Sequence, residues 1–402
     1  MSSRGGSDVD GVVEGERSRD GRLAEIARLF LRLGLVAFGG PAAHIAMMED
    51  EFVTRRGWVS HEHFLDLVGA TNLIPGPNST EMTMHLGYER AGWRGLVVAG
   101  FFFILPAATI TAVLAWMYVT YGSLPAVEPF LFGIKPAVLV VIAAAVWRLG
   151  RRAVSNWILG VLGIVSVTLV LLGVGEIVAL FAVGLVGMLW IRMTGAADSC
   201  SAARWLPILF QDSTSVALGA SAVAAAGTVS LWKLGVFFLK IGAILYGSGY
   251  VLVAFLDGGL VQGYGWLTEA QLLDAVAIGQ FTPGPVLSTA TFIGFILDGP
   301  AGSLVSTVAI FLPSFVFVLL LNPLIPRLRD SRWLSAFLDA VNVAAVGLML
   351  AVTIELSASV LVSWKALSIG AAAGLVFMWL RPNAAWIVIG GAVAGWALLA
   401  VG

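Results

Sequence analysis

Two Pro-Gly-Pro tripeptides, Pro75–Pro77 and Pro283–Pro285, have the clearest chemical potential in this sequence. Proline removes a backbone donor and disfavours a helical residue before it, so each tripeptide predicts that one helix ends and another begins. A helix N-terminus presents free N–H groups and a partial positive charge, which suit a small anion. Two such starts, approaching from opposite leaflets of a membrane, could hold a tetrahedral oxyanion between them.

Polar side chains surround both tripeptides. Those that could contact an anion or cap a new helix are Asn72, Asn78, Ser79 and Thr80 around the first, and Gln280, Thr282 and Ser288 around the second. The predicted substrate-binding set adds the tripeptides themselves, Pro75, Gly76, Pro77, Pro283, Gly284 and Pro285. A proline in a membrane helix often only kinks it. Here the repetition and the polar flanks favour a binding role over a simple kink.

A second pair of breaks lies earlier in each half of the chain. The first contains Gly39, Gly40 and Pro41, and the second contains Gly247 and Ser248 at the corresponding place. Glycine clusters of this kind serve either close helix packing or the wall of a cavity. Both readings stay open, and these five residues join the predicted binding set.

Charged residues inside apolar segments are costly and usually functional. Lys135 is therefore a candidate anion ligand, with Asn342 as its counterpart in the second half. Glu81, one turn beyond the first tripeptide, is a candidate proton carrier if transport is coupled to protons. The single cysteine and the four histidines have no metal-ligand spacing, so the sequence predicts neither a metal nor a cofactor, and no catalytic residue.

The composition identifies the elements that must position these residues. Hydrophobic residues make up 59% of the chain and charged residues 12%, against about 25% charged in an average soluble domain. Charge-free stretches about as long as the ~20 residues that cross a hydrocarbon core occur at 95–127, 153–175, 213–232, 275–297, 299–326 and 382–402. The sequence therefore predicts an all-α, multi-pass protein in a lipid bilayer. The net charge of −1 gives no reason to expect a nucleic-acid partner.

The chain is a tandem repeat. A shift of 208 residues places the first tripeptide on the second, and the same shift aligns Gly34 with Gly242 and Trp58 with Trp266. Short or interrupted hydrophobic segments at matching points of two halves are typical of transporters whose substrate site lies near the membrane midplane.

Four regions are predicted. They are a disordered cytoplasmic tail at 1–21, an N-terminal transporter repeat at 22–195, a connector at 196–212 and a C-terminal repeat at 213–402. Predicted membrane spans, about thirteen in all, lie near 24–47, 62–88, 94–120, 128–149, 155–174, 176–193, 213–231, 234–256, 268–297, 301–322, 334–355, 363–380 and 383–401.

Arginine placement predicts the orientation of these spans. Most arginines fall on one side if the N-terminus is cytoplasmic. The span at 213–231 has no counterpart in the first half, so the second half would insert upside down relative to the first. This topology treats 62–88 and 268–297 as crossing spans; the alternative is that both are re-entrant.

The combination of these motifs resembles the chromate ion transporter family, long two-domain type. The residues that carry the resemblance are Phe38 to Pro41, Gly57 and Trp58, Asn72 to Pro77, and Gln280 to Pro285. The resemblance covers nearly the whole chain after the tail and implies two homologous halves of opposite orientation. It also implies chromate efflux across a bacterial inner membrane, conferring chromate resistance. The second half departs from the pattern, with Ser248 and Gly249 where the first half has Gly40 and Pro41.

The leading hypothesis is a secondary active transporter that exports chromate. No Walker motif is present, so a direct role for ATP is not expected. Chromate and sulfate are both tetrahedral dianions, so a transporter of sulfate or another oxyanion is an alternative, and an anion channel is another. A membrane-embedded enzyme is disfavoured because the predicted spans contain no cluster of histidine or cysteine. A homodimer is compatible with the sequence.

Overall fold

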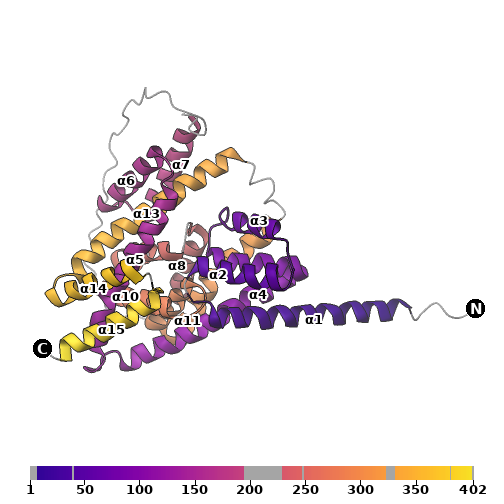
Figure 1. The fold of residues 1–402 in the computed structure, drawn as a ribbon, viewed down its shortest axis with the longest axis horizontal. Coiled ribbons are helices and arrows are strands. Elements are labelled where there is room, and N and C mark those ends of the chain that lie inside the picture. Colours follow the sequence, from indigo (N-terminus) through magenta and orange to yellow (C-terminus); the bar gives the residue numbers. More distant parts are fainter. Residues whose placement is uncertain are drawn as a thin grey trace, which may run out of the picture.

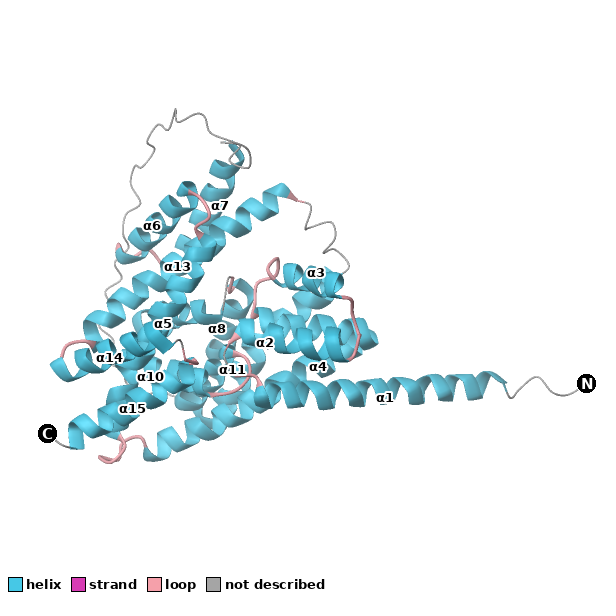
Figure 2. Cartoon of the chain, viewed as in Figure 1, coloured by secondary structure: helices cyan, strands magenta, loops and turns pink. Residues whose placement is uncertain are grey.

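The computed structural model describes residues 7–38, 40–193, 229–246, 249–322, 331–380 and 382–400, and these residues are almost entirely helical, without a strand (Figures 1 and 2). The first repeat comprises α1 (Ser7–Val36), α2 (Pro41–Glu49), η1 (Asp50–Arg55), α3 (His61–Thr71), α4 (Asn78–Tyr121), α5 (Glu128–Ala153), α6 (Trp157–Leu171) and α7 (Glu176–Met193). The second comprises α8 (Leu231–Ile244), η2 (Gly249–Val251), α9 (Leu252–Leu256), η3 (Asp257–Gly263), α10 (Glu269–Phe281), η4 (Val286–Ser288), α11 (Thr289–Leu321), α13 (Arg332–Val360), α14 (Trp364–Leu380) and α15 (Ala384–Ala400).

The length and composition of the helices suit a membrane protein. Five helical segments of the described chain are long and apolar enough to cross a bilayer: 78–121, 128–153, 176–193, 286–321 and 333–360. Large apolar side chains such as Trp157, Ile164 and Trp386 are about two-thirds exposed on the outer surface, where lipid would cover them. The predicted all-α multi-pass architecture is confirmed.

Matching local signals start the equivalent helices α3 and α10. Gly57 and Gly265 adopt φ angles of 60° and 62°, a left-handed turn that suits glycine. Three residues later, Ser60 and Thr268 cap the two helices through hydrogen bonds from the backbone N–H groups of His63 and Gln271. The repeat is therefore visible at the level of individual turns.

Each Pro-Gly-Pro tripeptide forms the tip of a helical hairpin. His63, at the start of α3, lies 3.4 Å from Glu89, near the end of the first segment of α4, so these two helical segments run antiparallel. In the second repeat, a Cβ on Gly279 would meet the side chain of Thr289 across the tip. At 1.5 Å per residue the 11 residues of α3 extend only about 16 Å, roughly half of a hydrocarbon core.

The expectation that 62–88 and 268–297 cross the membrane as single spans is therefore wrong. Gly76 and Gly284, between the prolines, have φ angles of 147° and 94°, and the chain turns back on itself there. Both hairpins are re-entrant. The polar backbone at the tips is acceptable because surrounding helices bury it.

A second reversal follows each hairpin inside the elements labelled α4 and α11. Gly92 and Gly299 have φ angles of 63° and 57°, and the residue before each is also non-helical. The two arms then pack so closely that a Cβ on Gly87 would meet the backbone of Gly95. Each label thus covers a half-length arm of the re-entrant hairpin and a long helix, at 93–121 in α4 and 300–321 in α11.

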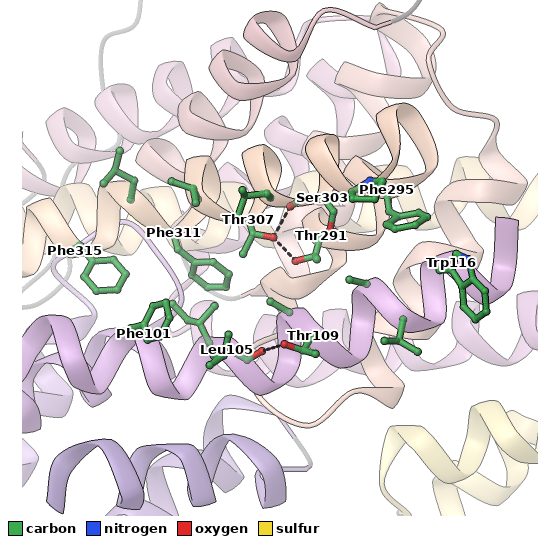
Figure 3. Close-up of a pocket in the computed structure, with 18 residues that line it drawn as sticks. Phe101, Leu105, Thr109, Trp116, Thr291, Phe295, Ser303, Thr307, Phe311 and Phe315 are labelled. Atoms are coloured by element: carbon green, nitrogen blue, oxygen red, sulfur yellow. Dashed lines mark hydrogen bonds between the residues drawn. The ribbon is translucent and has the colours of Figure 1, made fainter. Parts of the chain in front are cut away.

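These two long helices establish that the repeats are inverted. Along their interface, Phe101, Leu105 and Thr109 of the first helix lie in the same order as Phe315, Phe311 and Thr307 of the second (Figure 3). A Cβ on Gly100 would meet the ring of Phe315. The helices occupy equivalent places in their repeats and run antiparallel, so the two repeats have opposite orientations, as predicted.

The repeats also exchange their last helices. The helix α7 of the first repeat packs on α13 of the second, and α15 of the second packs on α5 of the first. Glycines make both contacts close: Gly133 faces Gly391 and Gly395, and Gly187 faces Ala340. Small residues let membrane helices approach each other in this way. Neither repeat could keep this packing alone.

The predicted tail and the predicted connector involve residues that the structure describes only in part or not at all. Helix α1 begins at Ser7 and projects from the body (Figure 1), so 7–21, predicted as a disordered tail, are helical. These residues contain no proline and several good helix formers, which the prediction underweighted against their polarity. The predicted connector at 196–212 and nearly all of the extra span at 213–231 lie outside the described residues, and the boundaries between the four regions stay predictions.

Candidate functional site

The two re-entrant tips are anchored at the centre of the molecule by the opposite repeat. The Gly76 N–H donates to the Leu245 carbonyl over 2.7 Å, and the Gly284 N–H donates to the Ala37 carbonyl over 2.8 Å. Ala37 and Leu245 are themselves equivalent under the 208-residue shift. Each tripeptide therefore binds the equivalent residue of the opposite repeat. Their glycine N–H groups already donate to protein carbonyls, so they are not free to bind an anion.

Two polar cavities lie beside these tips, and the same two side chains, Arg148 and Tyr250, line both. One cavity has a volume of about 460 Å³ and the other about 350 Å³. Arg148 comes from the last third of α5, and Tyr250 from the single turn of η2. These residues mark the point where the cavities adjoin.

Residues that flank the first tip line the larger cavity. The Asn78 side-chain amide donates to the side-chain oxygen of Asn72 over 2.8 Å, and this contact joins the two arms of the first hairpin beside the cavity. Asn78 is also the first residue of α4, so the positive end of that helical arm is directed at this cavity. Arg152 and Asn342 complete the polar lining.

The second tip lines the smaller cavity. Gln280, Thr282 and Gly284 belong to this wall, with Gly40 opposite them. The Tyr250 hydroxyl donates to the Gln280 side-chain oxygen over 3.3 Å. This contact links the second hairpin to the residue that both cavities share.

The charge of the lining favours an anion. Arg148 and Arg152 lie four residues apart on one face of α5 and expose their side chains, while Asp339 is the only acidic residue that the described part of the chain contributes to either lining. Arg148 also interacts with the Tyr250 hydroxyl, and no ion pair to Arg148 occurs within the described ranges. Its guanidinium can offer several N–H donors in a planar fork to an oxyanion.

The structure brings part of the predicted binding set to these cavities. The residues that line them are Gly40, Pro41, Asn72, Asn78, Gln280, Thr282, Gly284 and Asn342. A second group is buried in the hairpins and supports them: Pro75, Gly76, Pro77, Ser79, Thr80, Pro283, Pro285 and Ser288. Within that group, the Ser288 and Thr282 hydroxyls are 3.3 Å apart. Gly39, Gly247 and Ser248 lie outside the described residues.

Lys135 has a different environment. It lies near Asp274, whose carboxylate accepts a 2.9 Å hydrogen bond from Tyr118, and it lines neither polar cavity. Its counterpart Asn342 does line the larger cavity. The two equivalent positions therefore have different surroundings, which the repeat alignment could not show.

Glu81 lies against the first tip. Its side chain is fully buried, and the hydroxyl of Ser314 lies beside its carboxylate, whose oxygens have no other hydrogen-bond partner in the described part of the chain. A Cβ on Gly76 would meet both this carboxylate and the hydroxyl of Ser314. Burying an ionised carboxylate with so few donors around it is costly.

Arg148, Arg152 and Tyr250 are absent from the binding set that the sequence predicts. The two arginines follow the apolar stretch of α5, where basic residues are typical of the cytoplasmic flank of a membrane span. Their four-residue spacing was the available signal, since it puts both guanidinium groups on one helix face. Nothing in the sequence indicated Tyr250. Its short helix η2 packs on α9, α13 and η4 of its own repeat, and its hydroxyl reaches Gly40 and Arg148 of the first repeat.

A larger groove of about 650 Å³ lies between the long helices of α4 and α11, but it does not suit an anion (Figure 3). Its lining is aromatic and aliphatic apart from three threonines and a serine. The threonine hydroxyls are already used: Thr109 donates to Leu105, and Thr307 donates to Ser303 and lies 2.8 Å from the Thr291 hydroxyl. The polar cavities are therefore the candidate site.

Comparison with known proteins agrees with this duplicated architecture. A family model described as chromate transporter matches residues 24–188 and again residues 232–396. The two matches are offset by 208 residues, the shift that superposes the tripeptides. The chain belongs to the chromate transporter family. It is accordingly a transporter and not an enzyme, and the resemblance drawn from the sequence is confirmed.

Three curated relatives of this transporter are similar over most of their length. A probable chromate transport protein of Synechococcus elongatus is 32% identical, covering 81% of this chain and 82% of the relative. A chromate transport protein of Cupriavidus metallidurans is 32% identical, covering 83% and 82%. One from Pseudomonas aeruginosa is 31% identical, covering 91% and 90%. No solved structure matches the chain.

Proposed function

We propose that this transporter exports chromate across the inner membrane and that the substrate binds where the two polar cavities adjoin, at Arg148. The observation that carries the proposal is the position of Arg148, a cation without an acidic partner in the described residues, beside both re-entrant tips. The similarity to proteins named as chromate transport proteins supports the choice of ion.

The chemistry of the lining fits a tetrahedral dianion. Arg148 supplies a planar set of N–H donors, and the side chains of Asn72, Asn342 and Gln280 supply amide donors from three different helices or helix ends. The start of α4 adds the positive end of a helix at Asn78. These groups read charge and shape, so sulfate is the natural competitor for the same site.

Inverted repeats supply a route for alternating access. The larger cavity extends from the tips to Arg152 and Ser155 at the C-terminal end of α5. An equivalent movement of the second repeat would open the opposite side, because the repeats are related by a pseudo-two-fold axis that lies across the long helices. With the N-terminus in the cytoplasm, the membrane potential favours outward movement of an anion by about 2.3 kcal/mol per charge per 100 mV.

Transport would be secondary active, driven by the proton motive force. In this scheme Glu81 is a candidate proton carrier, because it is a buried acid next to the first tip with the Ser314 hydroxyl beside its carboxylate. Because protons would enter while chromate leaves, protonation of Glu81 and binding of the anion would have to alternate. This coupling remains part of the proposal.

The test is uptake of labelled chromate by everted membrane vesicles, with and without a pH gradient and with sulfate as competitor. Arg148→Gln should raise the chromate concentration for half-maximal uptake by about ten- to a hundredfold, the cost of a lost charged hydrogen bond. Arg151→Gln, a neighbouring arginine directed at Trp147 on the outer surface, is the matched control and should behave as the wild type.

Three outcomes separate the possibilities. Stronger uptake of sulfate than of chromate would mean that sulfate is the substrate, and the proposed binding site would stand. Uptake without trans-stimulation by internal chromate would indicate a channel, since only a carrier exchanges substrate across the membrane. An unchanged affinity in Arg148→Gln would contradict the binding site itself.

A further inference from the structure

Four acidic residues from the two repeats form a cluster that the proposed anion site does not use. Asp257 begins η3, Glu269 begins α10, Glu176 begins α7, and Glu355 lies near the end of α13. The carboxylates of Glu355, Glu269 and Glu176 all act electrostatically on Asp257. Four elements from both repeats therefore bring like charges together, an arrangement that costs free energy unless something neutralises it.

Asp257 is the buried member of this cluster. Its side chain is 2% exposed, and its Oδ1 atom has no hydrogen-bond partner among the described residues. The other interaction of its carboxylate is with Gln262, on its own helix. A Cβ on the adjacent Gly258 would collide with the Glu176 carboxylate, so Glu176 lies directly against this turn. The charged side chains that act on the Asp257 carboxylate in the described chain are all acidic.

The position of the cluster is related to the anion site by the internal symmetry. The helices α5 and α13 end at Ala153 and Val360. Aligning these two ends gives a repeat shift of 207 residues for this pair of helices. Arg148 and Glu355 are therefore equivalent positions. Since the repeats are inverted, the acidic cluster lies toward the opposite membrane face from the Arg148 cavities.

We propose that Asp257, with Glu176, Glu269 and Glu355 around it, is a second protonation site, in addition to Glu81, and is required to couple the pH gradient to anion movement. The inference rests on the proposed function, because it assumes that an anion is carried. Neutralisation by a proton fits better than a metal ion, since the acids do not converge as a metal-binding group within the described residues. A proton needs only one free oxygen, and Asp257 offers one.

The first repeat provides a built-in comparison. Glu49 and His61 occupy the positions equivalent to Asp257 and Glu269. His61 Nδ1 lies 3.1 Å from a Glu49 carboxylate oxygen, so the acid of the first repeat has a partner. In the second repeat, Asp257 has an acid, Glu269, at the position equivalent to His61. Glu49→Gln is therefore a control of the same residue class at the equivalent place.

The experiment uses the full-length protein in proteoliposomes and measures two properties separately. Counterflow of labelled chromate at equal pH on both sides reports carrier activity. Chromate-dependent proton movement, followed with an internal pH dye, reports coupling. We expect Asp257→Asn to retain counterflow and to lose chromate-dependent proton movement. Glu49→Gln should retain both.

The possible failures are distinguishable. Absence of counterflow in the wild type would refute the proposed function. Normal counterflow with normal proton movement in Asp257→Asn would refute the coupling site alone, as would loss of both activities in a correctly inserted protein. Stimulation by a sodium gradient in place of a pH gradient would also overturn it. If Asp257→Asn fails to insert, Glu355→Gln carries the same test.

Discussion

One pair of equivalent positions in the two repeats carries opposite charges. Arg148 of α5 lies at the junction of two polar cavities, whereas Glu355, its equivalent in α13, belongs to an acidic cluster. Duplication and inversion would place the same residue at both ends of the transport path. In the two proposals made above, this divergence assigns one end to the anion and the other to the proton that is coupled to it.

The re-entrant tips show the opposite behaviour. The backbone contacts of Gly76 and Gly284 are the same to within 0.1 Å, since each donates to the end of the first helix of the other repeat. The side chains around them differ: Gly76 lies beside Glu81 and Ser314, and Gly284 lies beside Ala107. Symmetry was kept where the backbone geometry builds the fold and was lost where side chains do the chemistry.

The largest effect is expected when Arg148 is made to resemble its equivalent. Arg148→Glu places an acid at both positions, and like charge repels a dianion in a cavity that is poorly screened. Transport of labelled chromate should be abolished while the protein remains in the membrane, as judged by its yield and its thermal unfolding in detergent. Arg151→Glu, on the exposed surface, tests whether added negative charge alone has this effect. Residual transport in Arg148→Glu comparable to that control would show that the two ends are not specialised.

A strong effect, unequal between the repeats, is expected at the tips. Alanine at Gly76 or Gly284 must adopt a φ angle that is costly for any residue with a Cβ, by about 1–2 kcal/mol. The new Cβ at position 76 would also displace the buried Glu81 carboxylate, whereas at position 284 it would meet the Ala107 methyl group at 3.0 Å.

Both tip variants should reduce transport, and Gly76→Ala should reduce it further. Initial rates in everted vesicles, normalised to the amount of inserted protein, measure the difference. Gly374→Ala is the control, because a Cβ there meets nothing within 4 Å on α14. Equal losses in the two tip variants would mean that the side chains beside them do not distinguish the repeats.

A moderate effect is expected from the pair formed by Lys135 and Asp274. Sequence analysis treated Lys135 as an anion ligand, but the structure places it beside Asp274 and Tyr118. Lys135→Gln should therefore lower thermal stability, because it removes the cation near a buried carboxylate, and should leave chromate affinity unchanged. Adding Asp274→Asn should recover part of the lost stability. A weakened affinity in Lys135→Gln that the second change does not restore would return Lys135 to the binding set.

The sequence was sufficient for those features that a repeat or a local rule determines. The 208-residue shift predicted two homologous halves, the arginines with the unmatched span at 213–231 predicted their inversion, and the prolines predicted both helix breaks. Local signals could not decide whether the chain at 75–77 continues or turns back, because that depends on the φ angle of Gly76 and on a carbonyl in the other repeat. The same limit applies to Tyr250, which reaches the cavities through contacts between the halves.

The smallest effect concerns how each repeat fastens its hairpin to the helix that precedes it. In the first repeat Glu25 pairs with Arg56 at 3.1 Å and with Arg90 at 3.0 Å. In the second, the position equivalent to Arg56 is Tyr264, whose ring lies 6.0 Å from that of Phe237 on α8 and stacks on Trp266 at 4.4 Å. One attachment is ionic and the other aromatic.

Glu25→Gln should destabilise the protein by only about 0.5–1 kcal/mol, since both ion pairs are partly exposed and screened by water. The loss should shrink as salt concentration rises, because added ions already weaken the pairs in the wild type. Thermal unfolding in detergent at low and high salt measures this. Tyr264→Leu removes the stacked ring and should give a loss that salt does not change. A salt-independent loss in Glu25→Gln would show that the first attachment depends on packing, and that the repeats differ less than their residues suggest.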